Sequence, residues 1–263
     1  MEIGVASMTA RGVAAYRRSF ERIAVSYGRP DDDQLLQEHV AAGVAAPPSN
    51  LSKYLRARTA FIDAAVVGAI SDGVAQIVSV GAGYDGRFLR YAAPGVRWFE
   101  LDHPATQADK RERLDLLGLD ATGVGFASAD FTTDDIGTAL IAAGLDSSAV
   151  SLFTCEGVTG YLDVATIKRL IRALRDSSSV GSRMAIEIPL VTERDDDHAR
   201  RASLQATVGS LGEPLVGAIA RDDLPAFVAA TGWRALDAVD ARGVALADGA
   251  RNTAFVTAIA ADH

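Results

Sequence analysis

The sequence predicts an α/β fold in which a mostly parallel β-sheet is covered by helices on both faces. Three observations support this prediction. Short apolar runs alternate with helical stretches, a glycine-rich turn follows the first of these runs, and two further runs come in quick succession near the C-terminus. Short apolar strands that alternate with helices are typical of parallel sheets that are buried on both sides.

The N-terminal part of the chain is predicted to be helical. Apolar residues recur every three or four positions over residues 13–27, which favours an amphipathic helix. Pro30, followed by three aspartates, marks a new start. We expect a linker or loop over residues 43–50, which include two prolines, and a second helix over residues 52–70.

Seven strands are predicted in the rest of the chain. They span residues 76–80, 96–101, 124–128, 150–154, 183–188, 233–238 and 254–259. Predicted helices lie at residues 87–92, 104–117, 134–143, 164–176 and 222–230. The last two strands are separated by a short turn, so we expect an antiparallel hairpin. Residues 190–221 are predicted to contain a lid insertion, because residues 192–214 are long and polar.

Composition limits the classes of function. The chain has 263 residues, enough for one large domain, and 49% of them are hydrophobic, which argues against disorder. A net charge of −8 disfavours nucleic acid or an anionic membrane as the main partner. No apolar run reaches the ~18 residues of a membrane span. Charged residues such as Arg17 and Arg18 interrupt the apolar core that a signal peptide needs. We therefore expect a cytoplasmic protein, either a monomer or a homodimer.

The most informative segment is the turn at residues 81–86, Gly-Ala-Gly-Tyr-Asp-Gly. Gly81 and Gly83 allow the backbone to bend sharply and to approach a ligand where a Cβ atom would clash. Glu100 and Asp102 end the next predicted strand, about 20 residues after the turn, where carboxylates accept hydrogen bonds from ribose hydroxyls. The segment therefore predicts a pocket for a nucleotide cofactor.

Two cofactors fit such a turn, because class I methyltransferases hold S-adenosylmethionine with the same strand–turn–helix geometry that nicotinamide enzymes use. Dinucleotide folds usually begin with this turn, whereas here 80 residues precede it. Tyr161 is followed four places on by Ala165, so the Tyr-x-x-x-Lys pair common in short-chain hydride enzymes is absent. Asp130 and Glu156 place acids after two further predicted strands. Together with the C-terminal hairpin, these features favour S-adenosylmethionine.

Four segments resemble the leucine carboxyl methyltransferase superfamily, including its bacterial branch of small-molecule S-adenosylmethionine-dependent methyltransferases. They are residues 56–63, 80–87, 99–104 and 155–162, with a weaker fifth at residues 212–214 and 226–233. The resemblance implies a class I methyltransferase (Rossmann-like) fold with a seven-stranded, mostly parallel sheet. It also implies an N-terminal helical cap at residues 1–71 and an S-adenosylmethionine-binding methyltransferase domain at residues 72–263.

The resemblance assigns roles to individual residues. An arginine of the family grips the methionine carboxylate of the donor, which points to Arg58, with Arg56 as second choice. The other implied roles are Gly81 and Gly83 against the methionine, Asp102 and Glu100 at the ribose, Asp130 and Phe131 around the adenine, Glu156 facing the donor's amino group, and Tyr161 facing the acceptor. The chain departs from the family where Gly86 replaces the threonine of a common Asp-Thr-Arg sequence.

Structural interpretations remain open for several of these residues. Arg58 lies in register with the apolar stripe of its predicted helix and so needs an anion, but Asp63 is an alternative partner. Asp102 could form a surface salt bridge, and Asp130 could cap the following helix. Cys155, the single cysteine, excludes an internal disulfide and is interpreted as a small core residue.

No metal site is predicted. Residues 31–33 and 195–197 are runs of aspartate, whose oxygens suit hard cations, but such runs more often cap helices or lie in solvated loops. His103 precedes Pro104 and could fix a turn or act as a base. His198 lies in the polar stretch and is interpreted as a solvated loop residue.

The predicted reaction is methyl transfer from S-adenosylmethionine, which leaves S-adenosylhomocysteine. A carboxylate acceptor is already ionised at neutral pH, whereas a hydroxyl needs a base such as His103, His198 or a loop aspartate. Tyr161 and His103 are the candidate catalytic residues. We expect an O-methyltransferase (EC 2.1.1) that acts on a carboxyl or hydroxyl of a small molecule in polyketide, lipid or sugar metabolism. A nicotinamide-dependent oxidoreductase and a non-catalytic S-adenosylmethionine-binding protein are the alternatives.

Overall fold

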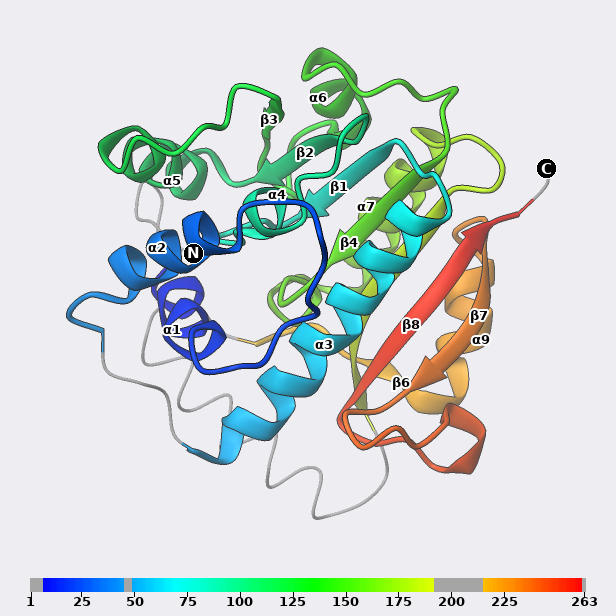
Figure 1. Ribbon diagram of the computed structural model, residues 1–263. Coiled ribbons are helices and arrows are strands. Elements are labelled where there is room, and N and C mark those ends of the chain that lie inside the picture. The colour runs from blue at the N-terminus through cyan, green and yellow to red at the C-terminus, as the bar shows by residue number, and fades with distance from the viewer. Residues whose placement is uncertain (1–6, 45–48, 192–214, 262–263) are drawn as a thin grey trace.

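A mixed β-sheet forms the centre of the protein in the computed structural model, which describes residues 7–44, 49–191 and 215–261 (Figure 1). The strand order within these residues is β3-β2-β1-β4-β5-β8-β7, and the short β6 pairs with β5. The strands are β1 Gln76–Val80, β2 Arg97–Asp102, β3 Val124–Ser128, β4 Ser151–Cys155, β5 Arg183–Val191, β6 Ile219–Ala220, β7 Trp233–Val239 and β8 Thr253–Ala260.

The sheet is parallel except at one edge. Strands β1 to β6 pair in parallel, whereas β8 runs antiparallel to both β5 and β7. The class of fold and the C-terminal antiparallel strands are therefore confirmed. Each predicted strand lies within three residues of an observed one at both ends. The strand order reverses between β1 and β4, which opens a crevice at the carboxyl ends of the central strands.

Helices cover both faces of the sheet (Figure 1). The helices are α1 Met8–Arg17, α2 Pro30–Ala41, α3 Ser49–Ser71, α4 Arg87–Arg90, α5 Pro104–Leu116, α6 Ile136–Ala142, α7 Val164–Asp176 and α9 Leu224–Ala229, with 3₁₀ turns η1 Thr159–Tyr161, η2 Arg221–Asp223 and η3 Leu246–Asp248. Two apolar clusters lie on opposite faces of the sheet, because successive side chains of a strand point to opposite faces. Ile77 packs with α1 to α5, whereas the next residue, Val78, packs with α6, α7 and α9.

The prediction of one continuous helix over residues 13–27 is wrong. Helix α1 ends at Arg17, and the Ser19 hydroxyl donates a hydrogen bond to the carbonyl of Tyr16 at 2.8 Å. The periodic apolar residues beyond this point pack separately on neighbouring elements. Phe20 contacts Tyr16, and Tyr27 packs on the cluster around α2 to α5. Their spacing therefore reflects a segment that wraps over other helices rather than one helical stripe.

The expected loop at residues 43–50 and the expected lid at residues 190–221 lie only partly within the described residues. Helix α3 begins at Ser49, inside the stretch expected to be a loop, and residues 45–48 lie outside the description. The polar part of the predicted lid, residues 192–214, also lies outside it. The edges of the predicted insertion are strands, because β5 continues to Val191 and β6 follows. The division into a cap and a second domain stays a prediction.

Candidate functional site

A cavity of about 360 Å³ lies at the carboxyl edge of the sheet, where the strand order reverses. Parallel sheets bind ligands at this position, and the volume falls within the range of small-molecule sites. Helices α1 and α3 and the loops that follow β1, β2, β3 and β4 contribute most of the lining. The residues that line the cavity include Arg17, Arg58, Gly81, Gly83, Asp102, His103, Asp130, Phe131, Glu156, Gly157, Val158, Tyr161, Leu162 and Val216.

The glycine turn follows β1 and forms one wall of the cavity. Gly81 has φ of 66° and Gly83 has φ of 50°, both in the left-handed region that favours glycine. A Cβ atom on Gly81 would lie 1.8 Å from Cγ2 of Val158, so no larger residue fits without displacing the loop after β4. The turn thus brings bare backbone to the cavity, as the sequence predicts.

Asp102 ends β2 and lines the same cavity. Its carboxylate accepts hydrogen bonds from the backbone N–H groups of Gly83 and, at 2.6 Å, His103. Burial raises the pKa of Asp102, and these two hydrogen bonds partly oppose the increase. The carboxylate therefore ties the glycine turn to the end of β2 and keeps lone pairs available for a ligand.

Glu100 is predicted beside Asp102, but the structure does not bring it to the cavity. It lies two residues earlier in β2 and is only 1% exposed. There, Nζ of Lys110 on α5 lies 2.6 Å from one carboxylate oxygen, and the other oxygen has no hydrogen-bond partner. Burial raises the pKa of Glu100 to about 7. Residues two apart on a strand share a face of the sheet, but they lie at different distances from its carboxyl edge. The alternation of side chains therefore could not predict that only Asp102 reaches the cavity.

Asp130 and Phe131 line the cavity from the loop after β3. The Asp130 carboxylate accepts hydrogen bonds from the hydroxyl and the backbone N–H of Thr132, at 2.6 and 2.8 Å, and these bonds lower its pKa. The cap of α6 is Asp135, whose carboxylate accepts a hydrogen bond from the N–H of Thr138. Asp130 is thus no cap of this helix, and it lies at the cavity wall instead.

Glu156 follows β4 and is surrounded by cations. Its carboxylate lies 3.0 Å from a nitrogen of Arg17, 3.0 Å from Nε of Arg58 and 2.6 Å from Nη1 of Arg87. Burial alone would raise the pKa of Glu156, but the three guanidinium groups hold it well below its usual range. The sequence predicts Glu156 and Arg58 at this pocket but not Arg17 or Arg87.

Arg58 points from α3 into the cavity, and only 7% of the residue is exposed. Besides Glu156, its guanidinium contacts Glu187 of β5 at 3.3 Å and lies 5.6 Å from the centre of the Tyr54 ring. The Glu187 carboxylate also accepts hydrogen bonds from Tyr54 and from the backbone N–H of Gly157. These contacts fix Arg58 between α3 and the loop after β4.

The alternative partner of Arg58 is engaged elsewhere. Asp63 accepts hydrogen bonds from Arg22 at 2.5 and 2.9 Å and from Arg87 at 2.6 Å. Arg56, the second choice for the donor carboxylate, is exposed, and its guanidinium lies 5.4 Å from the centre of the Phe20 ring. The structure therefore brings Arg58, and not Arg56, to the cavity.

The two candidate catalytic residues both line the cavity. Tyr161 belongs to the 3₁₀ turn after β4 and is half-buried. His103 is the N-cap of α5, and its Nδ1 accepts a hydrogen bond from the N–H of Ala105 at 3.3 Å. His103 therefore caps a helix, in line with its structural interpretation, and it also lines the cavity. His198 lies outside the described residues.

Arg17 is the main residue of the cavity that sequence reasoning missed. It is the last residue of α1, is 8% exposed, and lies beside Glu156. It belongs to no sequence motif. It lines the cavity because α1 lies across the carboxyl edge of the sheet. Several other arginines lie nearby in the sequence, so no local signal could single it out.

No metal centre is evident in the described ranges, where no group of three or more His, Cys, Asp or Glu residues is arranged to hold an ion. Residues 31–33 form the first turn of α2, and the buried Asp33 pairs with Arg22 and Arg90. Residues 195–197 lie outside the description. Cys155 is fully buried in the core, as predicted. None of the described helices is both long enough and apolar enough to span a membrane.

Comparisons with known proteins match this chain to a family of methyltransferases. Residues 16–175 match the family model described as leucine carboxyl methyltransferase. A protein of Mycobacterium avium (strain 104), named as an S-adenosyl-L-methionine-dependent methyltransferase, is 30% identical over 218 residues, which cover 80% of this chain and 69% of that protein. A second protein of that strain with the same name is 32% identical over 200 residues, 73% of this chain and 63% of that protein.

Solved structures share the fold at low sequence identity. A methyltransferase structure from Thermobifida fusca aligns with a TM-score of 0.59 and 16% identity, over 99% of this chain and 97% of that one. Magnesium protoporphyrin IX methyltransferase from Synechocystis aligns with a TM-score of 0.53 and 12% identity, over 88% of this chain and 94% of that one. At such identities the likeness concerns the fold alone.

The fold is that of the class I methyltransferases. The family match covers more than half of the sequence, and the chain belongs to the leucine carboxyl methyltransferase family. It is an S-adenosylmethionine-dependent methyltransferase, and this membership favours the methyl donor over the nicotinamide alternative.

Proposed function

We propose that this enzyme transfers the methyl group of S-adenosylmethionine to an oxygen atom of a small molecule, with a carboxylate as the preferred acceptor. The observation that carries the proposal is the convergence of arginines, bare glycine backbone and acidic loop ends in one cavity. The family, which takes its name from a carboxyl methyltransferase, supports oxygen as the methylated atom.

The donor's methionine carboxylate is assigned to Arg58 together with Arg17. Both guanidinium groups line the cavity, and arginine binds carboxylates through paired, charge-assisted hydrogen bonds. Glu156 suits the donor's ammonium, because a carboxylate has about four lone-pair sites and the three arginine contacts leave one open. Gly81 and Gly83 would then lie against the methionine.

The nucleoside is assigned to the loops after β2 and β3. Asp102 has the acceptor capacity for ribose hydroxyls, and Asp130 with Phe131 provides a polar and an apolar wall for the adenine. Glu100 is not part of this assignment, because it lies beneath the cavity with Lys110.

The chain's contribution to the reaction is positioning and exclusion of water. When bound, S-adenosylmethionine supplies a methyl group already activated by its positive sulfonium. Val158, Leu162 and Val216 give the wall near Tyr161 an apolar surface, against which the carbon skeleton of an acceptor can pack. Alignment of the two reacting atoms in such a site accounts for much of a displacement reaction's acceleration.

The state of His103 favours an acceptor that is already ionised. Its Nδ1 accepts the N–H of Ala105, so in the neutral ring the proton resides on Nε2, which is then a donor and not a base. A hydroxyl acceptor would need a base to remove its proton, whereas a carboxylate needs none at neutral pH. A carboxyl acceptor therefore needs no base from His103, which supports it as the preferred acceptor.

Methyl transfer from labelled S-adenosylmethionine to fractionated small-molecule extracts tests the proposal. Alkali hydrolyses methyl esters but not methyl ethers, so release of label by alkali identifies a carboxyl acceptor. We expect an alkali-labile product whose formation drops at least tenfold in Arg58→Ala and stays unchanged in Arg234→Gln, a change at an exposed arginine of β7. Label on nitrogen or sulfur, or donor binding without transfer to any fraction, would contradict the proposal.

A further inference from the structure

The glycine turn at residues 81–86 needs contacts from outside to hold one shape. It lies between β1, which ends at Val80, and α4, which begins at Arg87. Three of its six residues are glycines, and glycine reaches more backbone conformations than any other residue. Ordering a loop during binding costs affinity, so a pocket built on this turn gains from a turn that is already fixed. Asp102 fixes the N–H of Gly83, and the carbonyls that follow have partners of their own.

Lys110 of α5 holds one of these carbonyls. Its Nζ donates a hydrogen bond to the carbonyl of Asp85 at 2.6 Å and lies 2.6 Å from Oε1 of Glu100 in β2. Lys110 is only 1% exposed, and its Nζ lies 5.3 Å from the centre of the Phe88 ring. Apolar residues of similar volume often stabilise an interior as well as a buried ion pair does. Stability alone therefore does not explain a buried lysine here, whereas its hydrogen bond to the turn does.

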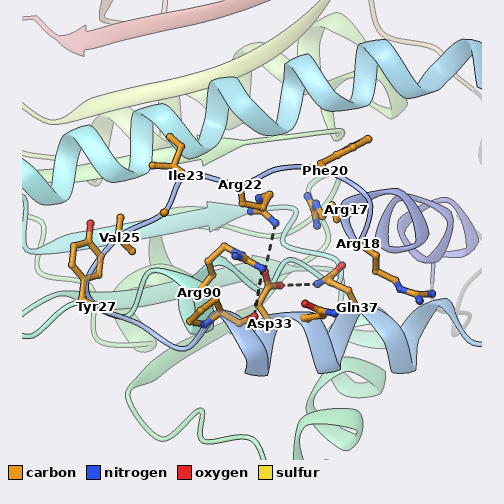
Figure 2. A pocket seen from close by; sticks show the side chains of 13 residues that line it. Arg17, Arg18, Phe20, Arg22, Ile23, Val25, Tyr27, Asp33, Gln37 and Arg90 are labelled. Carbon is orange, nitrogen blue, oxygen red and sulfur yellow. Dashed lines mark hydrogen bonds and ion pairs between the residues drawn. The ribbon is translucent and has the colours of Figure 1, made fainter.

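Gln37 of α2 holds the preceding carbonyl. Its Nε2 donates hydrogen bonds to the carbonyl of Tyr84 at 2.7 Å and to Oδ1 of Asp33 at 3.2 Å. Gln37 and Asp33 are both buried, and Asp33 is held in turn by Arg90 and, at 3.5 Å, by Arg22. These four side chains lie together at the wall of a cavity between α2 and the segment after α1 (Figure 2). The Gln37 amide is thus fixed in orientation before it reaches the turn.

Gly86 allows α2 to lie this close to the end of the turn. A Cβ atom at this position would lie 1.9 Å from Oδ1 of Asp33, the oxygen that accepts the hydrogen bond of Gln37. A larger residue would displace Asp33 and, with it, the orientation of the Gln37 amide. The glycine and the contact from α2 therefore depend on each other.

We propose that Lys110 and Gln37 are positioning residues for the methyl donor, because they hold two successive carbonyls of the glycine turn. Neither side chain lines the donor cavity, so each acts through the turn. A buried carbonyl without a donor is unfavourable, so loss of either side chain favours conformers in which the peptide rotates toward another donor. The inference rests on the proposed function, which assigns Gly81 and Gly83 to the methionine part of the donor.

Calorimetry on the intact chain tests the inference with two ligands, S-adenosylhomocysteine and methylthioadenosine, which keeps the nucleoside but lacks the amino-acid part. We expect Lys110→Met and Gln37→Met each to weaken S-adenosylhomocysteine at least about fivefold and methylthioadenosine less than about twofold. A general loss of structure would weaken both ligands alike. Lys168→Met and Gln34→Met are the controls, because they make the same changes at exposed positions of α7 and α2. Both controls should leave the two affinities unchanged.

A double variant separates positioning from stability. Lys110→Met alone leaves the buried carboxyl group of Glu100 without its partner and should lower the midpoint of thermal unfolding by at least about 5 °C. Glu100→Leu combined with Lys110→Met replaces the whole pair by apolar side chains and should recover most of this shift. The double variant should not recover the affinity for S-adenosylhomocysteine, because the carbonyl of Asp85 still lacks its donor.

Three results would overturn the inference. They are recovery of S-adenosylhomocysteine affinity in the double variant, equal losses of affinity for the two ligands, and losses in the controls as large as those in the test variants. Unchanged affinity in either single variant would overturn the role of that residue. Failure of S-adenosylhomocysteine to bind the wild type would instead contradict the proposed function.

Discussion

At the scale of single residues, the candidate site depends on buried charges whose partners come from distant parts of the sequence. Arg58 is held by Glu156 at 3.0 Å and Glu187 at 3.3 Å. Burial lowers the pKa of Arg58, but these two carboxylates more than reverse the effect, so the guanidinium stays charged. A fixed cation at the cavity wall is the feature that a carboxylate-bearing donor requires.

Replacement of Arg58 tests this feature. Arg58→Ala should weaken S-adenosylhomocysteine binding by at least about 1.5 kcal/mol, because a charge-assisted pair is lost. Arg58→Lys should recover only part of the affinity, because an ammonium cannot form the bidentate pair. Arg56→Ala is the control, since Arg56 is exposed on the same helix. Equal affinities for the wild type and both Arg58 variants would remove this residue from the donor site.

Glu100 gives a prediction about pH. Its pKa is raised to about 7 in the folded chain by burial, against 4.5 as the ordinary value. Between these pH values the folded chain keeps a proton that the unfolded chain has lost, so the contribution of Glu100 to stability falls as the pH rises. Glu100→Gln lacks this titration. Its free energy of unfolding relative to the wild type should rise by about 2–3 kcal/mol from pH 4.5 to 7 and then level off.

Chemical denaturation of both proteins across this range measures the difference. The amide keeps an oxygen to accept the hydrogen bond of Lys110, so the comparison isolates the charge. A difference that stays constant with pH would show that Glu100 titrates near its ordinary value.

At the scale of elements, the site is made by loops that leave parallel strands at one edge. The turn after β1 and the loop after β4 meet because these strands pair in parallel, with Val80 opposite Cys155. Val158 then lies against Gly81, so the two loops define each other's position. The short loops of this fold therefore bring residues far apart in sequence into one cavity.

Two glycine substitutions separate backbone strain from this contact. Gly81 and Gly73 both have positive φ, 66° and 79°, but a Cβ atom at Gly73 would meet nothing within 4 Å. Gly73→Ala should cost about 1–2 kcal/mol of stability and leave donor affinity unchanged. Gly81→Ala should in addition weaken S-adenosylhomocysteine binding at least tenfold, because Val158 must move. Equal donor affinities of the two variants, measured by calorimetry, would contradict this view of the turn.

At the scale of the whole molecule, the N-terminal helices and the sheet share one core. Ile62 and Val66 of α3 lie in the same apolar cluster as Ile77 of β1. Beneath them, the fully buried Arg87 contacts Asp63 of α3 and Glu156 after β4, each at 2.6 Å. We therefore expect the helices and the sheet to unfold together.

Calorimetric unfolding tests this expectation. The wild type should show one transition, and Asp63→Asn should remain a single transition that is less stable by about 3–5 kcal/mol, because Arg87 and Arg22 each lose one buried carboxylate partner. Asp72→Asn is a matched control, since the Asp72 pair with Arg183 is exposed. A separate early transition of residues 7–71 would show that the cap is an independent unit.

Much of the fold was predictable because its signals are local. The apolar run of β1 and the glycines after it specify a strand and a turn within a few residues. The helix expected over residues 13–27 failed because apolar spacing does not reveal which neighbour each side chain packs on.

The site was predictable where a residue ends a strand, as with Asp102 and Glu156. It was not predictable where the position depends on tertiary folding. Arg17 lines the cavity only because α1 crosses the sheet edge. Glu100 does not line the cavity, because it pairs with Lys110 in the interior. The ion pairs of Arg17 with Glu156 and of Lys110 with Glu100 have no signature in sequence spacing.

The arginines, the glycine turn and the acidic loop ends are proposed to form one donor pocket. Calorimetric titration of the intact chain with S-adenosylhomocysteine tests this proposal most directly. We predict saturable binding to one site per chain, weakened by Arg58→Ala and unaffected by Arg234→Gln. No heat of binding for S-adenosylhomocysteine, together with saturable binding of NADH, would contradict the account.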